Sequence, residues 1–303
     1  MTTTAPAPQP PAAPETREPR RASAFLYRHR LLRLSGLLAA PLFWLVVVYL
    51  GSLAALFVTA FWTVDDFTGQ VVRSFTTKNF ARVFTDPAYA GTVGRTLLIA
   101  VSVTVLCLII ALPLAFFMAR VAAPRWRPLL VALVLTPLWA SYLVKVYSWR
   151  AMLQPESGVV AWFLSPFGLD SPGYGEVAII ITLTYLWLPY MILPIYAGME
   201  RLPNSLIDAS YDLGAKTGRT FRSVVLPMIF PAVVAGSIFT FSLSLGDYIT
   251  AKIVGGKTIM LGNVVETTYV TNLPFAAAVA TIPVVIVVVY LLAVRRTGAL
   301  DNL

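Results

Sequence analysis

The sequence has 303 residues, of which 58% are hydrophobic and only 12% are charged. A soluble domain would carry roughly a quarter charged residues, so this composition excludes an ordinary water-soluble globular fold. The formal net charge of +9 would suggest nucleic-acid binding in a soluble protein. Here the basic residues gather at the ends of apolar blocks, where they set membrane topology, and we expect no nucleic-acid partner.

The first 33 residues are predicted to be a disordered, basic cytoplasmic tail. They are rich in Pro, Ala, Thr and Arg, and such a composition cannot bury enough apolar surface to fold. The rest of the chain, 34–303, is predicted to be one transmembrane domain.

Six apolar blocks follow, each about as long as the roughly 20 helical residues that cross a bilayer core. They lie at about 34–62, 96–117, 129–149, 177–199, 229–245 and 274–294. Lipid tolerates only backbone whose polar groups are satisfied internally. We therefore expect an all-α polytopic membrane protein with six transmembrane helices surrounded by the lipid bilayer.

The distribution of Lys and Arg between the blocks predicts the orientation. The N-terminal tail, the segments 120–127 and 201–222, and the pair 295–296 hold about twice as many as the opposite side. Because Lys and Arg accumulate in cytoplasmic loops, both termini are predicted to face the cytoplasm from a multi-pass position in the inner (plasma) membrane.

The segment 200–227, on the predicted cytoplasmic side, has the pattern of a helix, a tight turn and a second helix. Ser205 and Asp208 have the spacing of a capping box. Four residues then recur at the spacing of one helix face, namely Leu206, Ala209, Ser210 and Leu213.

Gly214 stands where a left-handed residue would end the first helix. A second short helix is predicted from about residue 217 to Leu226, and Pro227 is expected to stop it. The small residues of the first helix and the cations Lys216, Arg219 and Arg222 would suit a groove of another protein. The alternative is an amphipathic helix lying on lipid.

This segment resembles the cytoplasmic signature of ABC importer permeases, which reads Glu-Ala-Ala, three residues, Gly, nine residues, then Ile-x-Leu-Pro. The chain has Asp208-Ala209-Ser210, then Gly214, then Val224-Val225-Leu226-Pro227, at the same spacings. Asp replaces Glu, Ser replaces Ala and Val replaces Ile. The resemblance implies a coupling helix that docks on an ATPase, and the implied coupling residues are Asp208, Ala209, Ser210, Gly214, Arg219, Leu226 and Pro227.

Softer matches from about Asn79 onward resemble the spermidine/putrescine branch of these permeases. They are Asn79-Phe80, Pro137-Leu138-Trp139, Tyr142-Leu143, Tyr147-Ser148-Trp149, Gly246-Asp247-Tyr248, Gly255-Gly256 and Leu261-Gly262-Asn263. Branches for aminoethylphosphonate, opines, thiamine or ferric iron share several of them, so the cargo stays open.

The resemblance implies the fold of type I ABC importer permeases, with a core at about 90–296 and a coupling segment at 200–227. It also implies a second permease subunit, two ATPase subunits and an extracytoplasmic substrate-binding protein. ATP and Mg would bind to the ATPase, and this chain would hold no cofactor. Transport would proceed by alternating access.

A polyamine is a flexible polycation, which carboxylates and aromatic faces stabilise. Six residues are candidates for such a path. Trp139 and Tyr142 lie in the third span, Tyr185 and Trp187 in the fourth, and Asp247 and Tyr248 at the outer end of the fifth. An acidic residue near a span is a functional hypothesis by default. The alternative is that Asp247 only caps a helix, and that Trp and Tyr mark the membrane interfaces.

Catalytic chemistry has little basis in this sequence. A single His and a single Cys exclude most metal and nucleophile sites. Gly256-Lys257-Thr258 is similar to the end of a phosphate-binding loop, but the upstream glycine of that motif is Ala251 here. We expect a non-enzymatic subunit without an ATPase site or a metal site.

Two other classes of function compete with this interpretation. A stand-alone ion-coupled carrier would place carboxylates at mid-membrane within inverted repeats, whereas the span centres here are nearly free of acids. A membrane scaffold without transport would leave the pattern of 200–227 unexplained.

Overall fold

The computed structural model describes residues 38–39, 41–65 and 67–296, so the predicted tail lies outside the described residues. The chain forms two compact units, Met1–Ala55 and Leu56–Leu303. Over the described residues the regular structure is helical apart from one antiparallel hairpin of β1 (Thr63–Val64) and β2 (Val71–Val72). In it Thr63 pairs with Val72 and Val64 with Val71.

In the first unit a helical segment begins at Pro41. It contains the π-helical η1 (Trp44–Leu50), after which α3 (Gly51–Thr59) runs into the second unit. The side chains from 41 to 50 are all exposed, and most are apolar. Such a surface has to be covered by lipid or by another protein.

The second unit contains four more uninterrupted helices that are long and apolar enough to cross a membrane, counted over the described residues: Pro87–Val121, Glu176–Glu200, Thr217–Leu245 and Leu273–Arg295. With Pro41–Thr59 this makes five. A bent pair, Pro124–Trp139 and Tyr142–Met152, gives a sixth span if the two helices are taken together. The prediction of six spans therefore holds only with this broken pair included.

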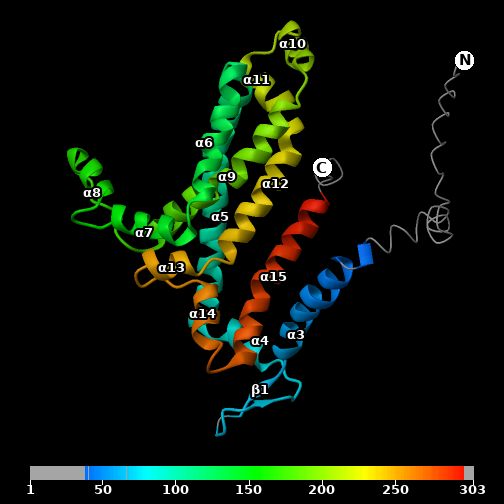
Figure 1. Ribbon diagram of the computed structural model, residues 1–303, viewed down its shortest axis with the longest axis vertical. Coiled ribbons are helices and arrows are strands. Elements are labelled where there is room, and N and C mark those ends of the chain that lie inside the picture. The colour runs from blue at the N-terminus through cyan, green and yellow to red at the C-terminus, as the bar shows by residue number, and fades with distance from the viewer. Residues whose placement is uncertain (1–37, 40, 66, 297–303) are drawn as a thin grey trace, which may run out of the picture. The chain divides into compact units, whose positions relative to one another are not determined.

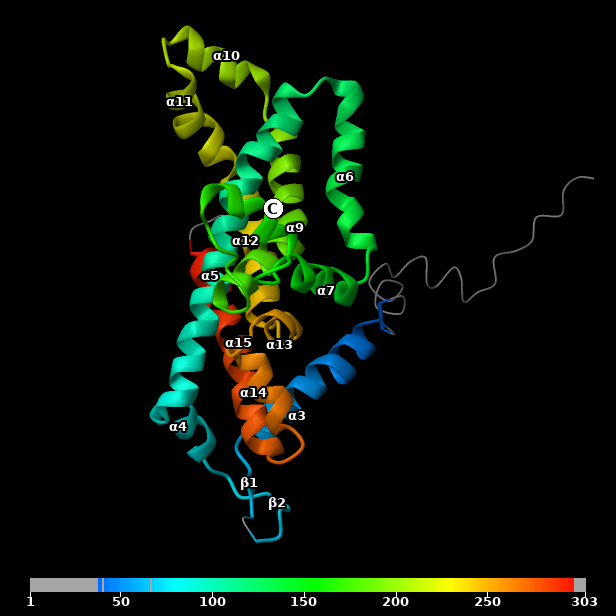
Figure 2. The same cartoon turned by 90° about the vertical axis from the view of Figure 1, so that its left-hand side faces the viewer.

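Three helices form the centre of the second unit (Figures 1 and 2). They are α5 (Pro87–Phe116), α9 (Glu176–Glu200) and α12 (Leu226–Leu245). Their apolar side chains share one buried cluster, and small residues allow the backbones to approach closely. A Cβ on Gly236 of α12 would lie 3.2 Å from Met191 Cα of α9.

The remaining elements of the second unit connect and flank these helices. They are α4 (Lys78–Thr85), η2 (Phe117–Val121), η3 (Pro124–Trp126), α6 (Arg127–Trp139), α7 (Tyr142–Met152), α8 (Val159–Leu164), η4 (Ser165–Phe167), α10 (Asn204–Asp212), α11 (Thr217–Thr220), η5 (Phe221–Val225), α13 (Ile249–Val254), α14 (Leu261–Thr268) and α15 (Leu273–Arg295). A second apolar cluster joins α4, α14 and α15 around Phe275.

The third predicted span is not a single helix. The chain bends by 91° between α6 and α7, where Ala140 and Ser141 are extended with ψ angles of 142° and 137°. Pro137 lies in the last turn of α6 and cannot donate its backbone N–H. Apolar residues continue beyond the bend, although α7 is less hydrophobic than α6, so the sequence predicted a single span here.

Candidate functional site

The predicted coupling segment, 200–227, runs from the last residue of α9 through α10, α11 and η5 to the start of α12, and α10 is its first helix (Figure 2). The helix begins at Asn204 and is preceded by Pro203, which makes no side-chain cap. The predicted capping box is therefore wrong, because Ser205 already lies inside the first turn. The side chain of Asn204 accepts a hydrogen bond from Arg120, a tertiary contact that the local spacing does not reveal.

The end of α10 follows the prediction. Gly214 has a φ of +79°, a left-handed conformation that glycine adopts without steric cost. The Ala215 N–H donates to Ser210 O at 3.1 Å and the Gly214 N–H donates to Tyr211 O at 2.8 Å. These two bonds form a Schellman motif, which satisfies the last carbonyls of the helix.

The sequence predicted that the second helix of the segment stops at Pro227. This prediction is wrong. A single helix runs from Thr217 to Leu245. It passes through the π-helical η5, where the Leu226 N–H donates to Phe221 O, five residues back. Pro227 then occupies the first turn of α12. The wider turn, which comes directly before the proline, lets the helix continue.

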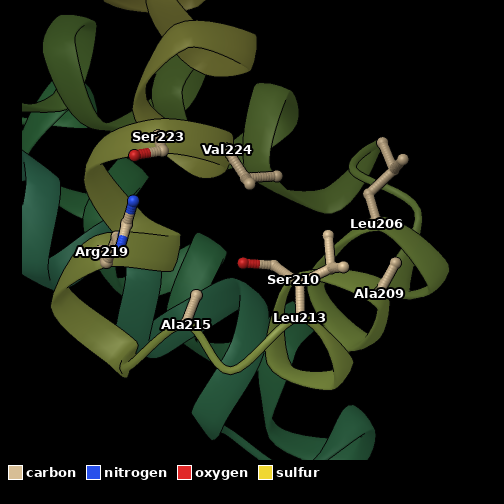
Figure 3. Close-up of a pocket in the computed structure, with 8 residues that line it drawn as sticks. All are labelled: Leu206, Ala209, Ser210, Leu213, Ala215, Arg219, Ser223 and Val224. Carbon is tan, nitrogen blue, oxygen red and sulfur yellow. The ribbon is translucent and has the colours of Figure 1, made fainter.

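A groove of about 360 Å³ lies between α10 on one side and α11 and η5 on the other (Figure 3). Its lining includes the four residues predicted to share one helix face, Leu206, Ala209, Ser210 and Leu213. The other lining residues are Ala215, Arg219, Ser223 and Val224. The Ser210 and Thr220 hydroxyl oxygens lie 2.9 Å apart. Serine at the position where the family has alanine therefore connects the two helices across the turn.

Apolar side chains of this segment reach the solvent. Leu213 is 89% exposed and Leu206 41% exposed, while the carboxylate-bearing Asp208 is exposed on α10 and does not line the groove. Leu226 lies apart from them and packs against the central apolar cluster. Exposed leucines beside a carboxylate and the cation of Arg219 form a surface suited to binding another protein.

The structure also brings together candidates that the sequence placed on separate spans. The Tyr142 hydroxyl of α7 donates to Oδ2 of Asp247, in the turn after α12. It also lies 2.7 Å from Thr250 Oγ1, and the Thr250 N–H donates to Asp247 Oδ1 at 2.8 Å. Asp247 is only 8% exposed, so both of its oxygens are engaged inside the protein.

Aromatic rings continue from this hydrogen-bonded group. Trp187 stacks on Tyr142 with ring centroids 6.1 Å apart, Tyr190 follows at 5.9 Å, and Phe239 of α12 lies 6.4 Å from Tyr190. The indole nitrogen of Trp187 is buried without a hydrogen-bond partner. We call Tyr142, Trp187, Tyr190 and Phe239 the aromatic row.

The other three path candidates lie elsewhere. Tyr185 packs against Trp149 at 5.5 Å, and Trp139 is 85% exposed at the end of α6. Tyr248 lines a separate groove that also includes Glu266. The sequence reasoning did not select Thr250 or Phe239, because their role depends on a neighbour from another helix.

Lys252 and Glu266 form an ion pair near this turn, with Nζ and Oε1 2.5 Å apart. The Glu266 carboxylate, as hydrogen-bond acceptor and as a negative charge, raises the pKa of Lys252. The carboxylate of Glu266 therefore already faces a cation of this chain.

Comparison with known proteins matches residues 111–296 to the family described as "Binding-protein-dependent transport system inner membrane component". The chain belongs to this family. It is 41% identical over 301 residues to the inner membrane ABC transporter permease protein YdcU of Escherichia coli, covering 93% of this chain and 95% of that protein. It is 36% identical over 212 residues to the spermidine/putrescine transport system permease protein PotB of Haemophilus influenzae, covering 68% and 73%.

Solved structures confirm the fold. A chain of a bacterial ABC transporter that imports alginate superposes with a TM-score of 0.69 at 17% identity, covering 91% of this chain and 99% of the other. A chain of the MetNI methionine ABC transporter gives a TM-score of 0.55 at 19% identity, covering 70% and 97%. The protein is thus a multi-pass membrane permease subunit of an ABC importer, in agreement with the sequence-based prediction.

The contact between Tyr142 and Asp247 can be tested by a double-mutant cycle. Tyr142→Phe and Asp247→Asn each disturb the same hydrogen-bonded group, so each should lower the thermal unfolding midpoint of the purified permease. The double variant should be little worse than the more damaging single variant, since coupled neighbours show interaction energies of about 0.5–3 kcal/mol. The measurement is thermal unfolding in detergent, and strictly additive shifts would contradict the contact.

Proposed function

We propose that this permease subunit carries a small cationic solute, and specifically a polyamine such as spermidine or putrescine, into the cytoplasm. The observation that carries the proposal is the aromatic row beginning beside the buried Asp247 carboxylate. Aromatic faces attract ammonium groups, most strongly where water is excluded. Relatives named as spermidine/putrescine permeases support the same cargo.

In this proposal the aromatic row contacts the cargo through its ring faces. Trp139, Tyr185 and Tyr248 would line the path at more distant points. Aminoethylphosphonate, an opine, thiamine or ferric iron are the alternative cargoes.

The proposed assembly contains a second permease subunit, two ATPase subunits that bind ATP and Mg, and an extracytoplasmic substrate-binding protein. One of the solved relatives is described in complex with a periplasmic protein that holds an alginate pentasaccharide. We further propose that both termini and α10 lie on the cytoplasmic side, so that α10 meets the ATPase.

The exposed face of α10 would act as the coupling helix. Leu206 and Leu213 supply apolar contact area, and Asp208 and Arg219 supply charges that fix its orientation. When ATP closes the two ATPase subunits, the docked segment would move with them, and the spans would open toward the outside. Docking of α10 on the ATPase would in this way favour either the inward-open or the outward-open arrangement of the spans.

The cargo proposal predicts which solutes stimulate ATP hydrolysis. In the complete complex reconstituted in nanodiscs, the binding protein loaded with spermidine or putrescine should raise the ATPase rate above the unloaded rate. Aminoethylphosphonate should not do so, because its phosphonate is repelled by the Asp247 carboxylate and by the ring faces. Stimulation by aminoethylphosphonate alone would refute the polyamine cargo and leave the permease assignment intact.

The coupling role of α10 predicts the effect of a bulky residue at Gly214. Gly214→Val forces a β-branched residue to a φ of +79°, at a cost of roughly 1–3 kcal/mol, and deforms the turn between α10 and α11. Transport should fall by about tenfold or more, a factor equivalent to about 1.4 kcal/mol, while the amount of protein in the membrane stays unchanged. The measurement is substrate uptake normalised to that amount.

Gly218→Val is the matched control, since Gly218 lies in α11 at a negative φ with open space around its Cα. Uptake by this variant should remain close to that of the unmodified protein. Equal uptake by both variants would contradict the coupling role of the turn.

The proposed topology predicts the accessibility of residue 208. The sequence has one cysteine, Cys107, which is fully buried, so Asp208→Cys introduces a single reactive thiol. A membrane-impermeant maleimide should label it in inside-out vesicles and not in intact cells. Labelling in intact cells would place α10 outside and overturn both the orientation and the ATPase contact.

A further inference from the structure

Arg120 lies in a basic segment that predicts the membrane orientation, but its hydrogen bonds go beyond what this role requires. It lies in the π-helical turn η2 at the end of α5, where the Ala122 N–H donates to Phe117 O, five residues back, at 2.8 Å. One widened turn of this kind changes the direction in which the following side chains point, and such turns are frequent at functional sites.

Three hydrogen bonds leave the guanidinium group of Arg120. Nη2 donates to Met199 O and to Leu202 O, both at 2.6 Å. Nη1 donates to the side-chain Oδ1 of Asn204 at 2.5 Å. One side chain therefore connects α5 to the last turn of α9 and to the first residue of α10.

The chemistry of these acceptors explains why an arginine is placed here. The last carbonyls of a helix have no partner within it, and a cation near them also interacts favourably with the helix dipole. The planar guanidinium offers several donors in a fixed geometry. A lysine would supply the charge without this geometry.

The hydrogen bonds from Arg120 reach residues on both sides of Pro203, which lies in the turn between α9 and α10. Leu202 and Asn204 are its two neighbours, and both are held by the same group. Any rotation of α10 about Pro203 would therefore have to break hydrogen bonds to α5. The far part of α5 is fastened in turn, because Thr96 Oγ1 accepts from the Leu261 N–H of α14 at 3.0 Å.

We propose that Arg120 is the positioning residue that ties α10 to α5, so that a displacement of α10 by the ATPase moves α5 as well. The inference rests on the proposed coupling role of α10. It assigns a second route into the membrane domain, in addition to the direct continuation of α11 into α12.

The test uses the complete complex in nanodiscs with two readouts. The first is the amount of substrate transported per ATP hydrolysed. The second is the distance distribution between spin labels at Asp212→Cys on α10 and Ile109→Cys on α5, two exposed positions that are not among the proposed coupling residues. Arg120→Gln should broaden the distribution and lower transport per ATP by about tenfold, as expected for losing at least one charge-assisted hydrogen bond. Arg120→Lys should restore both in part.

Arg125→Gln is the matched control, because Arg125 lies over the ring of Trp126 instead. Asn204→Ala removes one of the three acceptors, leaves Arg120 in place, and should broaden the distribution less. If the Arg120→Gln variant does not assemble into the complex, the Asn204→Ala variant still tests the proposal. The proposal is overturned if neither variant broadens the distribution relative to Arg125→Gln, or if broadening leaves transport per ATP unchanged.

The result also separates this inference from the proposed function. If Gly214→Val abolishes transport while Arg120→Gln transports normally, the coupling helix stands and the role of Arg120 falls. If neither substitution changes transport, the proposed coupling role itself is refuted.

Discussion

The constraint on which this structure depends is that a helix in lipid must satisfy its backbone polar groups inside the protein. The interior of a span meets this condition wherever no proline interrupts its hydrogen bonds, so much of the difficulty concentrates where helices end or break. At the end of α9 the guanidinium of Arg120 supplies donors to two carbonyls. At the end of α10 the left-handed Gly214 closes the turn with backbone bonds alone. Arg120 and Gly214 thus satisfy backbone groups at the two helix ends that bound α10 and the turn before it.

The break between α6 and α7 illustrates how such a point becomes a site. Only Ala140 and Ser141 separate the two helices, and the 91° bend directs α7 across the line of α6. Tyr142, the first residue of α7, reaches the carboxylate of Asp247 and the ring of Trp187. A straight helix would carry residue 142 along the line of α6 instead. The bend is thus what joins a residue of the third predicted span to the turn after α12.

Much of the fold follows from sequence, and the remainder depends on contacts between distant residues. Length and hydropathy predict the spans, and a glycine after a periodic face predicts the left-handed end of α10. The same hydropathy conceals the bend after Trp139, because lipid-compatible residues continue through it. The start of α10 was misplaced because Arg120, 84 residues earlier, fixes Asn204. Asp247 and Tyr142 were both selected from sequence, yet their contact spans 105 residues and no local pattern encodes it.

The corrected course of the helix at Pro227 decides how far a movement of the coupling segment can travel. A helix that stopped at the proline would leave a flexible joint between α11 and the membrane domain. The π turn keeps Thr217–Leu245 continuous over 29 residues, or roughly 44 Å at about 1.5 Å per residue. Its far end leads directly into Gly246 and Asp247, the turn that holds Tyr142. One rigid element therefore has the proposed ATPase contact at one end and the proposed cation path at the other, and a packed helix of this kind transmits displacement rather than absorbing it.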